Sequence, residues 1–345
     1  ECGLLPNGGN TAGLPPNVPL SGGPDGVIIC NLTSQQDVSP DCFDPTQEIK
    51  CGVDPVGTGA IQIGNYQSAW TPLNGIPPLN GWTFMWGSCC RPATVINLNP
   101  GTSSFSFQLR ATMYPYNNTN ASTCYDNSPD FLEDPKVVAC SGADIVYNNL
   151  GFDNDLDSLY YDWAYGKHSN GTNYQYHPGY AYNSPIPDAS FNALNTGISL
   201  DGASGQINFT CVTNGSYATV LKVEEWRCGQ KIGEIYRDIP LVVRPCVPTP
   251  DLCAQPPNQA PTLNIEVDST VYPNGPWVSP VYNASNQLVY YESTVYATEQ
   301  INLKLTSFDI DFKPDCNPQF ITFSASGGNL SDAVNYNDPT SCKYN

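Results

Sequence analysis

Short stretches of alternating hydrophobic and polar residues recur along this chain and predict an all-β protein. In Ser158–Trp163, for example, Leu159, Tyr161 and Trp163 alternate with Tyr160 and Asp162, so the two sets point to opposite faces of a strand. The hydrophobic runs are short and bounded by turn residues, and no long helical period is present. We therefore expect tandem β-sandwich modules.

The alternating stretches fall into three groups, which predict three β modules. The first module covers residues 1–134, in which a Cys-, Pro- and Gly-rich start is followed by expected strands at 60–63, 82–86, 93–98 and 104–111. The second covers residues 135–247, with expected strands at 145–150, 158–163, 205–212, 217–227 and 232–243. A Pro-rich linker, residues 248–261, precedes a third, incomplete module over residues 262–345, with strands at 262–267, 288–291, 301–305 and 320–323.

Two turn signals set the predicted connections within the second module. Thr213-Asn-Gly-Ser216 predicts a hairpin, because Asn and Gly both tolerate positive φ. Cys228-Gly229-Gln230 predicts the turn between the last two strands.

An acidic loop directly precedes the strand at 158–163. Asp153, Asp155 and Asp157 carry carboxylates close enough to repel one another unless they are solvated or share a cation. Counted from Asp153, the sixth residue is Ser158 and the twelfth is Ala164, where an EF-hand needs Gly and Glu. The hypothesis is a cadherin-like calcium site with Asp162 as a further ligand, and the alternative is an acidic turn capped by its own side chains.

A partial copy of this pattern follows later in the chain, at Phe308-Asp-Ile-Asp311. It gives a weaker candidate calcium site at Asp309 and Asp311, near Asp315. Calcium is the one cofactor that we expect.

The net charge of −19, from 32 acidic and 13 basic residues, argues against nucleic acid and anionic membranes as partners. There is no signal peptide and no apolar stretch of membrane-spanning length, so we expect a processed start or a piece cut from a longer chain, with no membrane insertion.

The chain has 14 cysteines without zinc, haem or redox spacing, which predicts a disulfide framework formed in an oxidising compartment. The candidates are Cys2, Cys30, Cys42, Cys51, Cys89, Cys90, Cys124, Cys140, Cys211, Cys228, Cys246, Cys253, Cys316 and Cys342. Their connectivity is left open, except that the neighbours Cys89 and Cys90 should have different partners.

Three stretches resemble a repeat of very large surface proteins that Bacteroidota secrete through the type IX system, including gliding-motility adhesins. They are Gly81–Pro92, Asn127–Tyr160 and Thr196–Cys246, which carry Gly-Trp-Thr-Phe-Met-Trp-Gly, Phe-Asp-Asn-Asp-Leu-Asp-Ser and Glu-Glu-Trp-Arg-Cys-Gly, and together they cover roughly residues 50–250. The resemblance implies cadherin-like or immunoglobulin-like modules in an extracellular fibre or adhesin, without catalytic activity. No C-terminal secretion-sorting domain is visible.

Tyrosines suggest a second kind of site. Tyr174, Tyr176, Tyr180 and Tyr182 could form a platform on which sugar rings stack, and the alternative is an edge strand or loop packed on its neighbour. Hydrolase chemistry is not indicated, because His168 and His177 lie outside any HExxH pattern and no GxSxG motif is present. Glycosylation is left open: Asn-x-Ser/Thr sequons occur, and Asp157-Ser-Leu and Asp268-Ser-Thr match a short O-glycosylation motif.

These observations together predict a non-enzymatic structural or adhesive segment of a bacterial cell-surface protein. Its expected partners are surface glycans or other modules of the same fibre. The alternatives are a subunit of a self-assembling extracellular filament and a carbohydrate-binding module.

Overall fold

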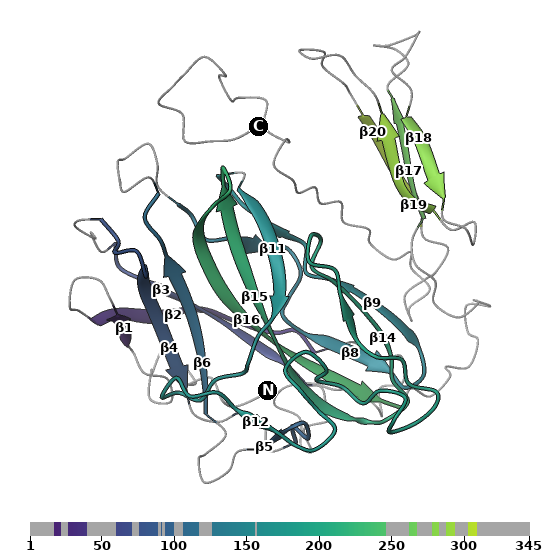
Figure 1. Cartoon of the computed structure of the whole chain (residues 1–345), viewed down its shortest axis with the longest axis horizontal. Coiled ribbons are helices and arrows are strands. Elements are labelled where there is room, and N and C mark those ends of the chain that lie inside the picture. The colour runs from purple at the N-terminus through teal and green to yellow at the C-terminus, as the bar shows by residue number, and fades with distance from the viewer. Residues whose placement is uncertain are drawn as a thin grey trace. The chain divides into compact units, whose positions relative to one another are not determined.

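The computed structural model describes residues 17–21, 27–39, 60–70, 76–88, 91, 94–99, 106–116, 126–155, 157–245, 262–267, 278–282, 288–293 and 303–308. They form strands, turns and bends, without a helix, so the all-β prediction is confirmed (Figure 1). No helix that could cross a membrane is found in this part of the chain.

The chain divides into two compact units, Glu1–Val247 with Ser324–Asn345, and Pro248–Phe323. The strands of the first are β1 (Asn17–Ser21), β2 (Val27–Asp37), β3 (Gln62–Ser68), β4 (Trp82–Ser88), β5 (Leu98–Asn99), β6 (Phe107–Met113), β7 (Asp130–Phe131), β8 (Val137–Cys140), β9 (Asp144–Asn148), β10 (Gly151–Phe152), β11 (Ser158–Trp163), β12 (Gln175–Tyr176), β13 (Ser199–Leu200), β14 (Gln206–Thr210), β15 (Gly215–Arg227) and β16 (Gln230–Arg244). The second unit contains β17 (Thr262–Val267), β18 (Val278–Tyr282), β19 (Leu288–Ser293) and β20 (Leu303–Phe308).

The first unit is built around the long hairpin of β15 and β16. Its turn is at Cys228 and Gly229, with φ of 54° and 73°, as the Cys-Gly-Gln signal predicts. Two successive positive φ values give the strands a twist that continues directly into a tight hairpin. β11 pairs with β15 on one side, while β16 pairs first with β6 and then, in parallel, with β8.

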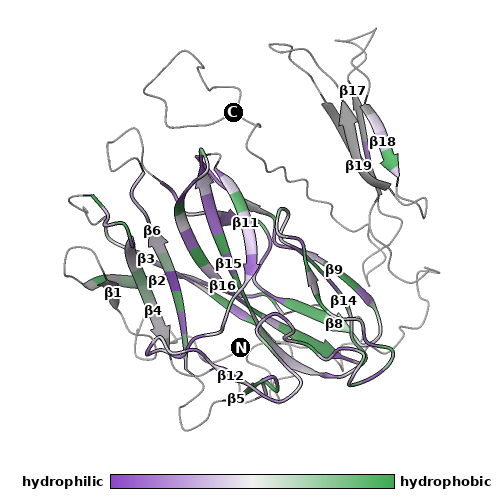
Figure 2. Cartoon of the chain, in the orientation of Figure 1, coloured by the Kyte–Doolittle hydropathy of each residue, from purple (hydrophilic) through white to green (hydrophobic). Residues whose placement is uncertain are grey.

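The main hydrophobic core lies under the half of this hairpin that is distant from its turn. Tyr217, Leu221 and Val223 of β15 and Ile239 and Leu241 of β16 are buried there against side chains of β8, β9 and β14. β9 and β14 belong to a separate sheet of order β13-β14-β9, so two sheets pack face to face. Figure 2 shows hydrophobic residues on β8 and the adjoining half of the hairpin, whereas the half near its turn is more polar.

The predicted boundary at residue 134 does not separate compact units. β4 and β6 come before it and β16 comes after it, yet β16, β6 and β4 are consecutive strands of one nine-stranded sheet of order β11-β15-β16-β6-β4-β1-β2-β3, with β8 on β16. The segment at 117–135 is rich in polar and turn residues, which mark the end of an element but do not show which strands pair. The later boundary, after residue 247, coincides with the division between the two units.

The hairpin predicted at Asn214-Gly215 is wrong. Gly215 is the first residue of β15 and lies opposite Val243, whereas β14 pairs with β9 and β13. The Asn-Gly signal therefore marks a passage from one sheet to the other.

In the second unit β17 pairs with β20 and β18 with β19, each antiparallel. The strands expected at 262–267, 288–291 and 301–305 are found there, the last one beginning at Leu303. The strand expected at 320–323 and the acidic pair Asp309 and Asp311 lie outside the described residues.

Candidate metal centre

The acidic loop between β10 and β11 is buried and held in a closed shape by its first carboxylate. Asp153 Oδ1 accepts hydrogen bonds from the backbone N–H groups of Asp155 at 2.8 Å and Asp157 at 3.0 Å. The three aspartates are only 6%, 9% and 5% exposed. The loop is thus capped by its own side chain, as the alternative interpretation of the sequence expected, yet it is not a solvated turn.

The other two loop aspartates attach the loop to distant parts of the chain. Asp155 Oδ2 accepts hydrogen bonds from the backbone and side-chain amides of Asn127, both at 2.8 Å. Asp157 forms a two-pronged ion pair with Arg227, in which Nε donates to Oδ1 at 2.7 Å and Nη2 donates to Oδ2. Arg227, at the end of β15, is 1% exposed.

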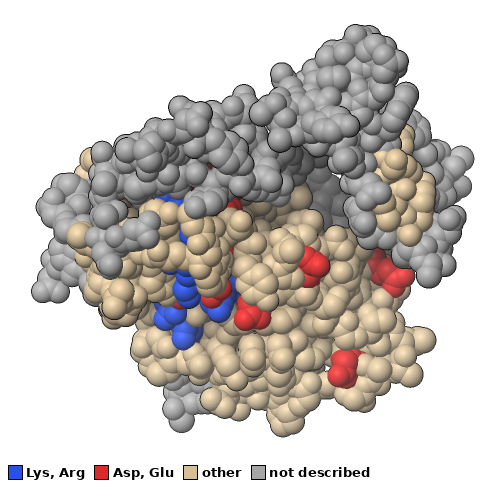
Figure 3. All heavy atoms as spheres, turned by 45° about the horizontal axis from the view of Figure 1, so that its top comes forward, with Lys and Arg blue, Asp and Glu red and all other residues tan. Residues whose placement is uncertain are grey.

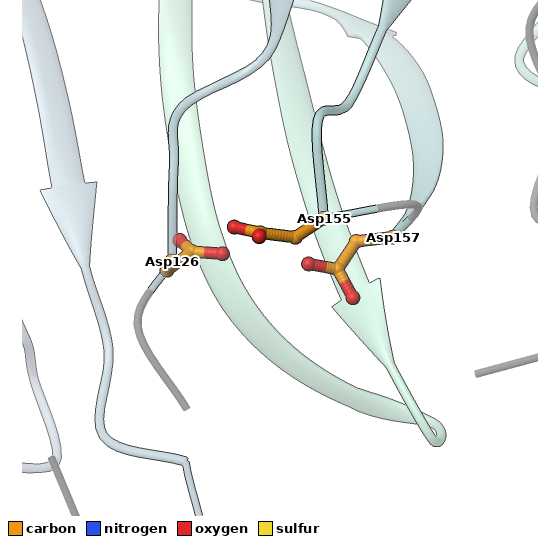
Figure 4. A group of neighbouring side chains, drawn as sticks. All are labelled: Asp126, Asp155 and Asp157. Atoms are coloured by element: carbon orange, nitrogen blue, oxygen red, sulfur yellow. The ribbon is translucent and has the colours of Figure 1, made fainter. Parts of the chain in front are cut away.

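Two further carboxyl groups, which the sequence analysis missed, complete this cluster. Oxygens of Asp126, Asp155 and Asp157 lie within 4.8 Å of one another. Figure 4 shows these three groups pointing toward one another, Asp126 from the segment before β7 and the others from the acidic loop.

Glu225 of β15, 1% exposed, is the fifth carboxyl group. A Cβ on Gly233 of β16 would overlap the Glu225 carboxylate and come within 2.9 Å of Asp126 Oδ2, so both acids occupy the space that this glycine leaves. We call Asp126, Asp153, Asp155, Asp157, Glu225 and Arg227 the acidic centre.

The acidic centre contains five carboxyl groups and one guanidinium. Besides its pair with Asp157, Arg227 Nη2 lies 3.6 Å from Asp126 Oδ1 and 3.9 Å from Asp155 Oδ2. Its positive charge is therefore shared among three acids. Asp126 Oδ1, Asp153 Oδ2 and Glu225 Oε1 are buried without a hydrogen-bond partner.

Burial and mutual repulsion make ionisation of these acids difficult. Burial, followed by the charge of Asp157, raises the pKa of Asp126 to about 7. Burial likewise raises the pKa of Asp153 to about 6, and burial with the nearby Asp126 charge raises that of Glu225 to about 10. Carboxylates in such surroundings need protons or a cation to offset their charge.

Asp162 is not part of the acidic centre, so its assignment as a calcium ligand is wrong. Its side chain is 55% exposed and lies 4.0 Å from Lys222 Nζ on the outer face of the sheet. The alternation along β11 explains the difference, because residue 161 points inward and residue 162 outward. Ion pairs on β15 and β16 connect Lys222 and Lys231 with Glu224 and Glu234. Figure 3 shows basic and acidic side chains interleaved on one face of the molecule.

The four tyrosines proposed as a sugar platform lie in different surroundings. Tyr174 is fully buried, with its ring stacked on His168 at 3.7 Å between centroids. Tyr180 packs against Phe191 and Tyr217, at the edge of the main core. Tyr182 stacks on Tyr165, with 4.3 Å between ring centroids, and Tyr176 contacts the same ring edge-on. A coplanar set of all four is therefore excluded, because the short turns around Gly179 reverse the chain between them.

Four of the 14 cysteines lie in the described residues. Cys140 is disulfide-bonded. Cys30, Cys211 and Cys228 are free thiols, contrary to the prediction for these three. Cys211 is buried in the main core as a small apolar residue, and Cys228 occupies the hairpin turn. The remaining ten candidates lie outside the described residues.

No protein-family model, curated protein or solved structure matches the chain. The interpretation of the acidic centre therefore rests on its own chemistry. Buried oxygen donors a few ångströms apart suit a small hard cation or shared protons.

Proposed function

We propose that the chain is a non-enzymatic, extracellular structural or adhesive segment of a bacterial cell-surface protein. The observation that carries this proposal is that charged side chains in the first unit are buried and connect loops to the central hairpin. Among its described residues, the buried Arg227–Asp157 pair joins the acidic loop to the central hairpin and is closed to solvent. Such pairs fix one arrangement of the chain, which a load-bearing segment needs, whereas catalysis needs polar groups that a substrate can reach.

A second buried pair acts in the same way on the other strand of the hairpin. Arg91 and Asp238 of β16 form a two-pronged ion pair in which both side chains are nearly buried, at 7% and 11% exposure. Arg237 donates to the backbone oxygen of Glu133 and lies 3.9 Å from the centre of the Phe131 ring. Each strand of the hairpin thus holds a separate loop.

The finer description of the fold belongs to the same proposal. The two sheets that enclose the main core form an immunoglobulin-like or cadherin-like module, the Cys140 disulfide is one of several bridges, and the secreted chain is exported as in the type IX adhesins that it resembles. Its partners are surface glycans or neighbouring modules of the same fibre.

The location tests this proposal first. Intact cells of the organism that encodes the chain should be treated with a membrane-impermeant biotin reagent before lysis. We expect the chain to be labelled without lysis, and deletion of its gene to reduce attachment of the cells to a surface. Labelling that appears only after the cells are opened would contradict an extracellular role.

One observation favours glycan binding as a second candidate function. Tyr165 is 42% exposed and stacks on Tyr182, so one exposed aromatic ring is held rigidly at the surface. Rigid aromatic faces bind sugars with little loss of side-chain entropy. Binding to a glycan array that is lost in Tyr165→Ala but kept in Tyr160→Ala, a change at another exposed tyrosine, would support this function.

A further inference from the structure

We propose that the acidic centre binds one calcium ion, which joins the acidic loop, the segment before β7 and the turn end of the central hairpin. The ion would be held by oxygens of Asp126, Asp155 and Asp157, with Asp153 and Glu225 supplying the remaining charge. This inference goes beyond the structural role proposed above and does not depend on the cellular location of the chain.

The first argument is the spacing of the donors. Oxygens of three carboxyl groups lie within 4.8 Å of one another, which is about twice the calcium–oxygen distance of about 2.3–2.6 Å. At that separation a point equidistant from three oxygens lies about 2.8 Å from each, so a small inward movement of the side chains lets one ion contact all three. The donors come from residue 126 on one side and residues 155 and 157 on the other (Figure 4), so the ion would bridge separate segments.

The second, independent argument is that buried oxygens around this position lack partners. Glu225 is 99% buried, and its Oε1 has no hydrogen-bond partner. Asp153 is also buried, and its Oδ2 likewise has no hydrogen-bond partner. An unsatisfied buried acceptor is costly, and the cost is larger for a charged group. Both oxygens lack a hydrogen bond although Arg227 lies in the same cluster, where its Nε and Nη2 donate to Asp157.

The third argument is the fit at Gly233. Even a methyl group at this position would overlap the Glu225 carboxylate. The glycine therefore permits two acids from different segments to lie side by side, an arrangement that repulsion opposes unless one of them holds a proton or a cation besides Arg227 lies near them. A protein that used these acids only for the Arg227 pair would not need Glu225 there.

The donor set indicates calcium in preference to other metals. All candidate ligand atoms are carboxylate oxygens, which suit calcium, magnesium and manganese rather than zinc or copper. Magnesium requires a near-octahedral shell at about 2.0–2.1 Å and usually retains several waters. A buried, carboxylate-rich site of this width favours the larger ion, which loses its water more readily.

The test is a calorimetric titration of the full-length, oxidised chain after treatment with chelator. We expect one calcium ion to bind per chain, magnesium to bind at least tenfold more weakly, and the melting temperature to rise by about 5 °C or more at a hundredfold excess over Kd. Glu225→Gln and Asp126→Asn should each weaken calcium binding at least tenfold.

Glu224→Gln is the matched control, because Glu224 directly precedes Glu225 in β15 and points to the opposite, outer face, where it pairs with Lys222. It should bind calcium as the wild type does. In chelator, Glu225→Gln should melt at or above the wild-type temperature, because a neutral amide takes the place of the buried acid without adding charge; this also shows that the variant folds.

Three results would overturn the site: no calcium binding by the wild type at millimolar concentration, unchanged binding in both Glu225→Gln and Asp126→Asn, or equal loss in Glu224→Gln. If Glu225→Gln does not fold, the wild type and Asp126→Asn still decide the question. Failure of the surface-labelling experiment would leave this result unaffected, so the two proposals can fail separately.

Discussion

At the scale of single residues, Arg227 is the side chain on which the acidic centre depends when no cation is bound. It is fully buried at the end of β15 and faces three aspartates. Its guanidinium carbon lies over the ring of Tyr116, 5.6 Å from the ring centroid. Removing one member of a buried ion pair leaves the other charge without compensation, which costs more than the pair itself contributes.

Arg227→Gln is therefore expected to lower the free energy of unfolding by about 3–5 kcal/mol in chelator. Urea unfolding followed by tryptophan fluorescence measures this change. Lys222→Gln is the control, since Lys222 is one-quarter exposed and pairs with Glu224 on the outer face, and its loss should cost at most about 1 kcal/mol. Equal losses of unfolding free energy in the two variants would show that the buried Arg227 pair is no more important for stability than the exposed Lys222 pair.

Single residues also show where sequence reasoning stops. The acidic loop and its self-capped shape follow from Asp153, Asp155 and Asp157, which are close in the sequence. Asp126 and Glu225 could not be found from spacing, because their contacts with the loop depend on strand pairing. One signal was present: Glu225 and Arg227 continue the inward-facing series of Leu221 and Val223, where charged residues are unexpected.

At the scale of elements, the hairpin of β15 and β16 organises the first unit. Most strands were predictable because their alternation is local: the stretch expected at 217–227 forms β15 from 215 to 227, and the one at 232–243 forms β16 from 230 to 244. Pairing was predictable only in part: Cys228-Gly229 forms the hairpin that it predicts, whereas the stronger turn signal at Asn214-Gly215 does not form one. Turn propensity describes the local chain only.

The turn itself can be tested, because Gly229 has φ of 73° and open space around its Cβ position. Gly229→Ala should cost about 1–2 kcal/mol through backbone strain alone. Cys228→Asn should cost little, since Asn tolerates the φ of 54° at this position. Thermal unfolding of the two variants measures both effects. A large loss in Cys228→Asn, of about 2–5 kcal/mol, would instead indicate that Cys228 forms a disulfide.

At the scale of the whole molecule, one sheet combines strands from the first and second predicted modules, and the Pro-rich stretch after residue 247 marks the division between compact units. Composition predicted the all-β class, whereas the number of modules depended on long-range pairing of β16 with β6. The excess of negative charge is partly internal, since five of the acids belong to the buried acidic centre.

The redox state of the cysteines gives a prediction at this scale. When the unreduced chain is denatured and alkylated, peptide mapping should find Cys30, Cys211 and Cys228 modified and Cys140 protected. A chain in which Cys140 is also alkylated would lack the bridge at the end of β8. Protection of Cys211 would show that it leaves its place in the core to form a bridge.

The central claim is that the buried acids of the first unit enclose a cation and thereby join three segments of the chain. A crystal structure of the full chain grown with calcium, and a second with terbium for its anomalous signal, tests this most directly. We expect a single ion with oxygens of Asp126, Asp155 and Asp157 at about 2.3–2.6 Å for calcium. An acidic centre that stays without an ion at saturating calcium, while exposed acids elsewhere bind terbium, would contradict it.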